Sequence, residues 1–146
     1  MHFHRIDYTR HEPVAFRALL SASQQVHEGV LGPELAELVF LRVSQLNGCS
    51  YCIDMHATAL RKAGVEPRKL DTVAGWRESR FFDARERAAL AWAEALTTLP
   101  GGAPADACYD ALAAHFDAQG ISALTMAIAL INAWNRLGVG LQPAMP

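Results

Sequence analysis

The sequence predicts an all-α protein of 146 residues. Three observations point that way. Prolines recur where the first turn of a helix tolerates them, and glycines follow apolar segments at places where helices commonly end. Apolar residues repeat at helical spacing, and no alternating runs flank a hairpin turn, so no β-strand is predicted. We expect a bundle of about six to eight helices joined by short connections.

The first three helices follow from these signals in order. An N-terminal helix is predicted at residues 13–26, beginning at a first-turn proline. A second helix at 33–46 also begins at a proline, is apolar nearly all round and is closed by Asn47-Gly48. A third helix at 50–63 ends with basic residues in its last turn and a glycine cap. A helix that is apolar on all sides is usually buried, so 33–46 is expected at the centre.

The middle of the chain predicts a short helix at 67–74 and a longer one that runs to about Leu99. The longer helix begins at a capping box in which Asp83 and Glu86 satisfy each other's backbone N–H groups. The segment PGGAP at 100–104 is a loop, because its prolines and glycines cannot continue a helix.

The last two helices are predicted at 104–117 and 121–136, with Gly138 and Gly140 ending the second. Large apolar residues surround most of the final helix, so it must be covered on several sides. A central core helix and a helix at a subunit interface both fit this pattern. These apolar residues are Leu124, Met126, Ile128, Leu130, Ile131 and Trp134.

Composition narrows the class of protein. Hydrophobic residues make up 51% and charged residues 19% of the chain, below the roughly 25% charged residues of a typical soluble domain. The net charge of −2 and the absence of a Lys/Arg cluster argue against nucleic-acid binding. The N-terminus has no signal-peptide core, and the longest apolar run, 121–131, is too short to span a bilayer. A soluble cytoplasmic protein with one domain, residues 1–146, is therefore predicted.

The segment NGCSYCIDMH at 47–56 holds two of the three cysteines. On a helix, Cys49, Cys52 and His56 share one face, and Cys52 lies one turn before His56. The start of a helix favours a thiolate, which can attack a peroxide O–O bond while His56 takes the proton. Cys49 is close enough to resolve a sulfenic acid on Cys52 as a disulfide.

Two other interpretations of this segment stay open. The cysteines could be incidental residues of a helix start, or Cys49, Cys52 and His56 could be three ligands of a structural zinc ion. Structural zinc sites usually have a second ligand pair at matching spacing, and the chain has no further CxxC or HxxxH motif. Cys108 is distant and is expected to be a packed core thiol. Disulfide scaffolds of secreted proteins do not fit three cysteines.

Charged residues on apolar helix faces are the remaining candidates for a site. Glu37 lies among apolar residues of the predicted helix 33–46, where it could serve as a general base or proton relay. Alternatively, it could be a solvated residue of the second turn that the helix dipole stabilises. Arg42 on the same helix could pair with a carboxylate such as Glu86 or Glu94, which otherwise fit solvated positions. Five further histidines have no predicted partner and are mostly expected at the surface. They are His2, His4, His11, His27 and His115.

Together these residues resemble a known family. The segment LRVSQLNGCSYCIDMH, with Glu37 twelve residues before Cys49, resembles the alkylhydroperoxidase AhpD-like family of the carboxymuconolactone decarboxylase superfamily. The family pattern is a Glu, eleven residues and then CxxCxxxH, and Glu37, Cys49, Cys52 and His56 match it. RERAALAWAEALT and INAWNRLG also look like its single-domain members, so the resemblance covers about 33–138. The decarboxylase branch lacks the CxxC pair, which argues against decarboxylation.

The resemblance implies an AhpD-like helical domain that assembles into trimers or hexamers. It also implies a peroxidase in which Cys52 attacks the peroxide, Cys49 resolves the sulfenic acid, and His56 with Glu37 forms a proton relay. No flavin, haem or metal cofactor is implied. The expected partners are a peroxide substrate and a thiol reductant, lipoyl-linked or thioredoxin-like.

One position departs from the family. The founding peroxidases carry a histidine immediately before the second cysteine, where this chain has Tyr51. The tyrosine hydroxyl could donate a hydrogen bond, but it cannot act as that histidine does. This departure favours an alternative function, a redox-sensing or disulfide-exchange module with little peroxidase turnover.

Overall fold

The structure is a computed structural model that describes residues 5–143. Within this range it contains eight α-helices, two short 3₁₀ turns and no β-strand, which confirms the all-α prediction. The 3₁₀ turns are η1 (Val73–Gly75) and η2 (Leu99–Gly101). The helices are α1 (Tyr8–His11), α2 (Pro13–His27), α3 (Pro33–Asn47), α4 (Ser50–Lys62), α5 (Pro67–Asp71), α6 (Ala84–Thr97), α7 (Asp106–Ala113) and α8 (Ala118–Leu141).

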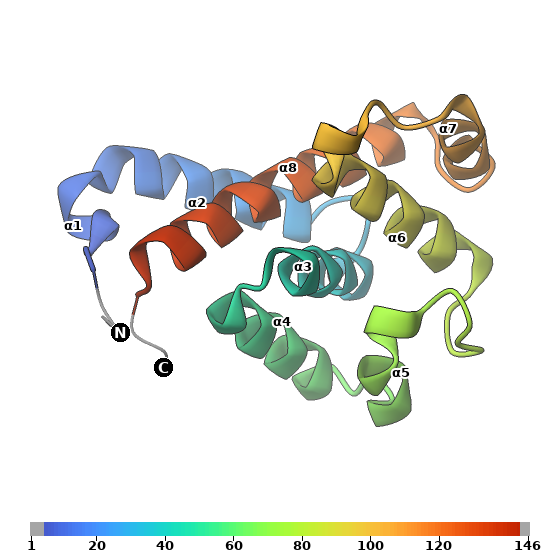
Figure 1. Ribbon diagram of the computed structural model, residues 1–146, viewed down its shortest axis with the longest axis horizontal. Helices are drawn as coiled ribbons and strands as arrows, with labels where there is room; N and C mark the ends of the chain where they lie inside the picture. Colours follow the sequence, from blue (N-terminus) through green and yellow to red (C-terminus); the bar gives the residue numbers. More distant parts are fainter. Residues whose placement is uncertain (1–4, 144–146) are drawn as a thin grey trace.

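Helix α3 lies at the centre of the fold (Figure 1) and packs against α4, α6 and α8. Helix α2 runs along α8, and α7 packs at the ends of α6 and α8. The two ends of the described chain meet, because the backbone N–H of Arg5 donates to the carbonyl of Leu141 at 3.1 Å. As predicted for a helix that is apolar nearly all round, α3 is largely buried. Its buried residues are Leu35, Ala36, Leu38, Val39, Phe40, Leu41, Val43 and Ser44.

Gly48 and Gly64 follow the ends of α3 and α4 as predicted, whereas Gly138 and Gly140 do not end α8. Gly48 closes α3 with a left-handed φ of 68°, a conformation that glycine adopts without steric cost. Helix α8, however, continues through Gly138 and Gly140 and ends only at Leu141, with Gln142 as its cap, so the predicted end was wrong. A glycine inside a helix costs about 1 kcal/mol relative to alanine, and packing contacts can outweigh that cost. The contact made by Gly138 is described below.

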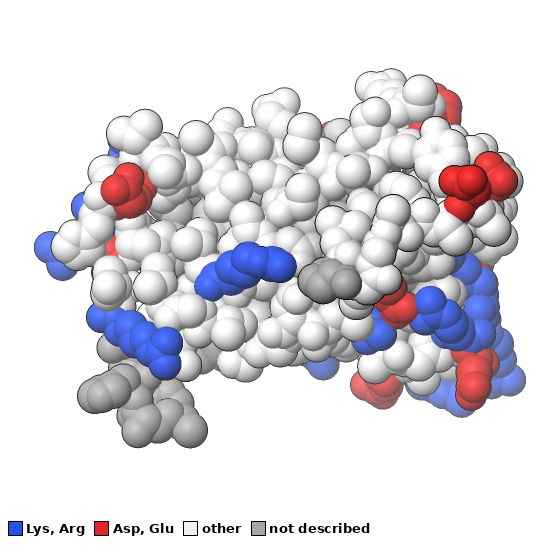
Figure 2. All heavy atoms as spheres, turned by 45° about the horizontal axis from the view of Figure 1, so that its top comes forward, with Lys and Arg blue, Asp and Glu red and all other residues white. Residues whose placement is uncertain are grey.

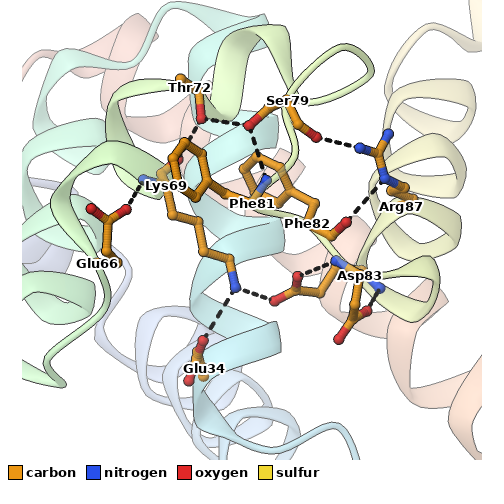
Figure 3. Close-up of polar contacts among 10 residues, drawn as sticks. Glu34, Glu66, Lys69, Thr72, Ser79, Phe81, Phe82, Asp83 and Arg87 are labelled. Carbon is orange, nitrogen blue, oxygen red and sulfur yellow. Dashed lines mark hydrogen bonds and ion pairs between the residues drawn. The ribbon is translucent and has the colours of Figure 1, made fainter.

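Polar contacts fix the segment between α5 and α6 (Figure 3). The predicted capping box is confirmed: the Asp83 side chain accepts from the Glu86 backbone, and the Glu86 side chain accepts from the Asp83 backbone. Lys69 reaches Glu86 at 2.5 Å and Glu34 at 3.5 Å. Burial alone would lower the pKa of Lys69, but Glu86 and Glu34 outweigh it and raise the pKa, so the amine stays charged. Glu86 is thus a mostly buried partner and not the solvated residue that its helix position suggested.

A second charged cluster joins α3 to α6. The guanidinium of Arg42 donates to Glu94 at 2.8 Å, which confirms the predicted pairing and selects Glu94 as the partner. The indole N–H of Trp76 donates to the same carboxylate oxygen at 2.8 Å, and Arg77 bonds the other oxygen. Glu94 is therefore largely buried and paired, which excludes the solvated alternative for it. These four side chains hold α6 against the central helix.

The outer faces of α2 and α8 are poor in charge. Val14 is 71% exposed, Met126 57% and Val139 45%. Figure 2 shows a broad face made mainly of uncharged side chains, with most charged ones gathered toward its edges. By length and composition alone, the 24-residue helix α8 could cross a membrane. The apolar run noted in the sequence, 121–131, is only part of this helix. Its buried side packs on α2, α3 and α6, as in the core of a soluble helical protein.

Candidate active site

The two cysteines of the CxxC motif lie at the start of α4 and form a disulfide bond. Cys49 is the N-terminal cap of the helix, and its sulfur accepts from the backbone N–H of Cys52 at 3.3 Å. The backbone N–H of Cys49 donates to the carbonyl of Ser44 at 3.0 Å, which ties the motif to the end of α3. Both sulfurs belong to buried residues, 2% and 3% exposed. The predicted closeness of the two thiols is therefore observed.

Helix α8 covers the thiol pair through Gly138. A Cβ atom at position 138 would lie 2.8 Å from the sulfur of Cys49 and 3.5 Å from that of Cys52. Cβ atoms essentially never approach another heavy atom so closely, so any other residue here would displace the disulfide or the helix. This contact gives Gly138 a packing role inside α8.

Amide side chains hold α8 beside the end of α3. The side-chain amide of Asn47 donates to the side-chain oxygens of Asn132 and Asn135, each at 2.9 Å. Asn135 is 1% exposed and donates in turn to the hydroxyl of Ser44 at 3.0 Å. The amide donors of Asn47 and Asn135 thus have acceptors inside the protein. A buried hydrogen-bond network that is satisfied in this way is rigid. It fixes the turn from which Cys49 begins α4.

His56 lies one helical turn after Cys52 and is bonded to Glu37. The Nδ1 atom of His56 is 2.7 Å from Oε2 of Glu37, and the His56 side chain is 9% exposed. The ring of His56 packs beside the ring of Phe40, with 5.1 Å between centroids. Its Nε2 atom is buried and has no hydrogen-bond partner. The structure thus places Glu37 in contact with His56, one helical turn beyond Cys52, and leaves the Nε2 atom of His56 without a hydrogen-bond partner.

Glu37 has a second partner that sequence reasoning missed. The Nε2 atom of His27, the last residue of α2, is 3.0 Å from Oε1 of Glu37. The Glu37 side chain is only 15% exposed, which excludes the solvated alternative. The sequence named no partner for His27, because the contact depends on how α2 packs and no local pattern reveals it. His11 and His115 are exposed as expected, whereas His2 and His4 lie outside the described residues.

A cavity of about 380 Å³ opens beside His56 and Glu37. Tyr51 lines it, together with His27 and Glu28, while neither cysteine does. Most of its remaining wall is aromatic or aliphatic. These side chains are Tyr8, Phe16, Leu20, Phe40, Met55, Ile131 and Trp134. The cavity therefore offers a mainly apolar chamber whose wall includes the bonded pair of Glu37 and His56.

Tyr8 and the third cysteine complete the description of the ionisable groups nearby. Burial, followed by the proximity of Tyr51 and Asp7, raises the pKa of Tyr8, so its hydroxyl in the cavity wall stays protonated and able to donate. Cys108 is a free thiol that packs partly buried against the core, in line with the prediction. Within residues 5–143, no three His, Cys, Asp or Glu side chains are arranged to hold a metal ion.

The comparison with known families follows from this constellation. The model of the carboxymuconolactone decarboxylase family matches residues 13–95, which include Glu37, both motif cysteines and His56. The chain belongs to the carboxymuconolactone decarboxylase family. The chain is 30% identical over 137 residues to the uncharacterized protein YdfG of Bacillus subtilis (strain 168), covering 94% of this chain and 93% of YdfG.

Two solved structures have folds similar to that of this member of the carboxymuconolactone decarboxylase family. A protein of unknown function from Agrobacterium tumefaciens, described as a candidate antioxidant defence protein AhpD, has a TM-score of 0.92, 37% identity and 98% coverage of both chains. The debrominase Bmp8, in complex with 2,3,4-tribromopyrrole, has a TM-score of 0.81, 23% identity and coverage of 94% of this chain and 74% of Bmp8. The first confirms the AhpD-like fold, and the second shares the fold alone.

Proposed function

We propose that this protein is a thiol-dependent peroxidase that reduces hydroperoxides through a Cys49/Cys52 dithiol–disulfide cycle. One observation carries the proposal: a disulfide-forming pair begins the helix on which His56 lies bonded to Glu37. A nucleophilic thiol needs a base within reach and a third group that orients the base. Cys52, His56 and Glu37 supply these parts in that order.

In the first half of the cycle, Nε2 of His56 takes the proton of the Cys52 thiol. The resulting thiolate attacks the terminal oxygen of the hydroperoxide, so that an S–O bond forms and the O–O bond breaks. The leaving alkoxide takes the proton from His56 and departs as an alcohol. Cys52 is left as a sulfenic acid. Glu37 stabilises the transient imidazolium of His56.

In the second half, the Cys49 sulfur attacks the sulfur of the sulfenic acid. The S–S bond forms, the S–O bond breaks, and the leaving hydroxide combines with the Cys49 proton as water. Two thiols and one hydroperoxide thus give one disulfide, one alcohol and one water. An external dithiol, lipoyl-linked or thioredoxin-like, then reduces the disulfide and is itself oxidised. Such a cycle suits the reducing cytoplasm, where we place the protein.

The cavity supports an organic hydroperoxide as the substrate. The cavity wall is mainly aromatic and aliphatic. Each methylene of a substrate that the wall removes from water contributes roughly 0.8 kcal/mol to binding. Hydrogen peroxide gains nothing from such a wall. Tyr8 and Tyr51 offer hydroxyl groups that can donate to a peroxide oxygen.

The proposed function predicts a preference among peroxides. With dihydrolipoamide as reductant, we expect cumene hydroperoxide to be consumed with a KM about 10-fold or more below that of hydrogen peroxide, because its ring enters the apolar chamber. Peroxide consumption and disulfide formation are measured together, with a thioredoxin system in parallel. One disulfide should form per peroxide consumed. A rate no faster than that of a free thiol, for either peroxide, would show that the protein is no peroxidase.

The alternative is a redox-sensing or disulfide-exchange module, favoured by Tyr51 at the motif. In that case peroxide still oxidises the thiol pair, but no dithiol donor recycles it efficiently. The fold does not decide between the two, since the debrominase Bmp8 shares it. Steady-state turnover separates them, because only a peroxidase consumes many equivalents of peroxide per chain.

We also propose that the protein assembles from copies of itself, as a trimer or hexamer. The support is the low-charge outer face of α2 and α8, with Val14, Leu20, Met126 and Val139 exposed. Exposed apolar patches on soluble proteins commonly mark interfaces. Light scattering coupled to gel filtration should therefore give a multiple of the 15.9 kDa chain mass. Replacing Met126 by lysine should lower that mass, whereas a wild-type mass of one chain would contradict the assembly.

A further inference from the structure

His27 connects the solvent-facing side of the cavity to the buried pair of Glu37 and His56. Its Nε2 atom is 3.0 Å from Oε1 of Glu37, while Oε2 of Glu37 is 2.7 Å from Nδ1 of His56. Each oxygen of one carboxylate therefore contacts one histidine. The exposed fraction of the side chain falls along this series, from 36% at His27 to 15% at Glu37 and 9% at His56.

The two contacts restrict how Glu37 can be oriented. In residues 5–143, His27 and His56 are the side chains that bond to Glu37. An ionised carboxylate only accepts hydrogen bonds, so the hydrogen-bonded His56 must present its Nδ1–H to Oε2. His27 lies at ion-pair distance from the other oxygen, Oε1. Because His27 contacts Oε1, a rotation of the Glu37 carboxylate away from His56 would also break the contact with His27.

The position of His27 is fixed independently of Glu37. One turn earlier on α2, the Ser23 hydroxyl accepts from the indole N–H of Trp134 at 2.8 Å, which ties α2 to α8. The ring of Phe16 packs against the same indole, with 5.9 Å between centroids. Helix α2 thus holds His27 over α3, and His27 can hold Glu37 in place.

From this geometry we infer that His27 is a positioning residue for the thiol chemistry: it fixes Glu37, and Glu37 fixes His56 as the Nδ1–H tautomer. The Nε2 atom of His56 is then a permanent acceptor, in line with its lack of any hydrogen-bond partner. That atom can take the proton of the Cys52 thiol one turn earlier on α4. The inference rests on the proposed function for its kinetic consequence, but the tautomer itself exists without turnover.

The test compares two substitutions of His27. His27→Gln keeps an N–H donor that can reach Glu37, whereas His27→Ala removes it. We expect the rate of the first turnover with cumene hydroperoxide to fall about 10-fold in His27→Ala. This is the lower end of the loss of activity seen when a group that orients a functional side chain is removed. His27→Gln should stay within about twofold of wild type. Imidazole added to His27→Ala should restore the rate, because the cavity opens beside the vacated position, and an equal ionic strength of sodium chloride should not.

A spectroscopic readout makes the test independent of peroxidase activity. In ¹⁵N-histidine-labelled protein, we expect the nitrogen shifts of His56 to report the Nδ1–H tautomer in the wild type and in His27→Gln, and a mixture of tautomers in His27→Ala. His115→Gln, a substitution of an exposed histidine beyond α7, serves as the matched control and should change neither rate nor shifts. Thermal unfolding of each variant shows whether it remains folded.

The outcomes separate the inference from the proposed function. If His27→Ala keeps the wild-type rate and the wild-type His56 shifts, or if His27→Gln loses as much as His27→Ala, the positioning role is wrong. If imidazole fails to restore the rate while the shifts remain unmixed, His27 only stabilises the fold. If the wild type consumes no peroxide, the proposed function fails, and the His56 shifts still decide the role of His27.

Discussion

Peroxide consumption is expected to fall on the order of 10³-fold or more when Cys52 is replaced by serine. A serine hydroxyl is far less nucleophilic than a thiolate, and removing the nucleophile of a concerted set costs as much as removing the whole set. The measurement is the steady-state loss of cumene hydroperoxide with dihydrolipoamide, together with the single turnover of the reduced protein. Because Cys52 is 3% exposed and serine is slightly smaller, the fold should be retained.

Two further cysteine variants sharpen this result. Cys49→Ser should still react once with peroxide but should stop at the Cys52 sulfenic acid, which dimedone traps and mass spectrometry detects. Cys108→Ser is the matched control, since Cys108 is a free thiol outside the site, and it should retain wild-type turnover. If Cys52→Ser consumed peroxide as the wild type does, or if the trapped sulfenic acid lay on Cys49, the assignment of the attacking thiol would fall.

The second large effect concerns stability. Glu94→Ala should lower the free energy of unfolding by about 3 kcal/mol, the lower end for breaking a largely buried ion pair. The reason is that Arg42, 13% exposed, and the indole N–H of Trp76 would both lose their acceptor. A loss of this size should lower Tm by roughly 6 to 12 °C in a domain of this size. Chemical and thermal unfolding, followed by circular dichroism, give both quantities.

The contribution of Glu94 should also depend on pH. Burial alone would raise its pKa, but hydrogen bonds from Trp76, Arg77 and Arg42 outweigh burial and hold the pKa below its ordinary value of 4.5. A carboxyl whose pKa is lower in the folded state contributes stability above its unfolded pKa and loses it as pH falls through the folded value. The difference between wild type and Glu94→Gln should therefore be full at pH 7 and shrink below about pH 4. Glu78→Gln, at an exposed position, is the control and should have little effect; a pH-independent difference would contradict the ion-pair explanation.

The sequence predicted the helices best where a local signal sets their ends. First-turn prolines fixed the starts of α2 and α3 to the residue, and Gly48 fixed the end of α3. The predicted helix 67–74 proved to be α5 followed by a 3₁₀ turn, and 104–117 shrank to α7 at Asp106–Ala113. Those differences arise because short helices depend on what they pack against more than on their own pattern.

Two sources allowed parts of the site to be predicted: contacts between residues that are close in sequence, and the family pattern. Cys52 and His56 lie on one helix and Cys49 caps its start, so spacing along the sequence was enough to place them together. Helical pattern singled out Glu37, but its pairing with His56 required the family pattern. The choice of Glu94 as the partner of Arg42 required the packing of α6 on α3. His27 approaches Glu37 from another helix at a distance that no spacing rule encodes. Contacts across helices are therefore the part of this site that the tertiary fold, and not local sequence, determines.

The glycine of α8 that faces the thiol pair also bears on how the two oxidation states are accommodated. Reduction separates two bonded sulfurs to the greater distance of nonbonded atoms, so the dithiol form takes up more volume than the disulfide. The Cβ that Gly138 lacks would lie 2.8 Å from the Cys49 sulfur, so this sulfur already fills the space that a side chain at position 138 would need. A larger residue there would therefore take room from both oxidation states, and we expect the bulkier dithiol to lose more by it than the disulfide.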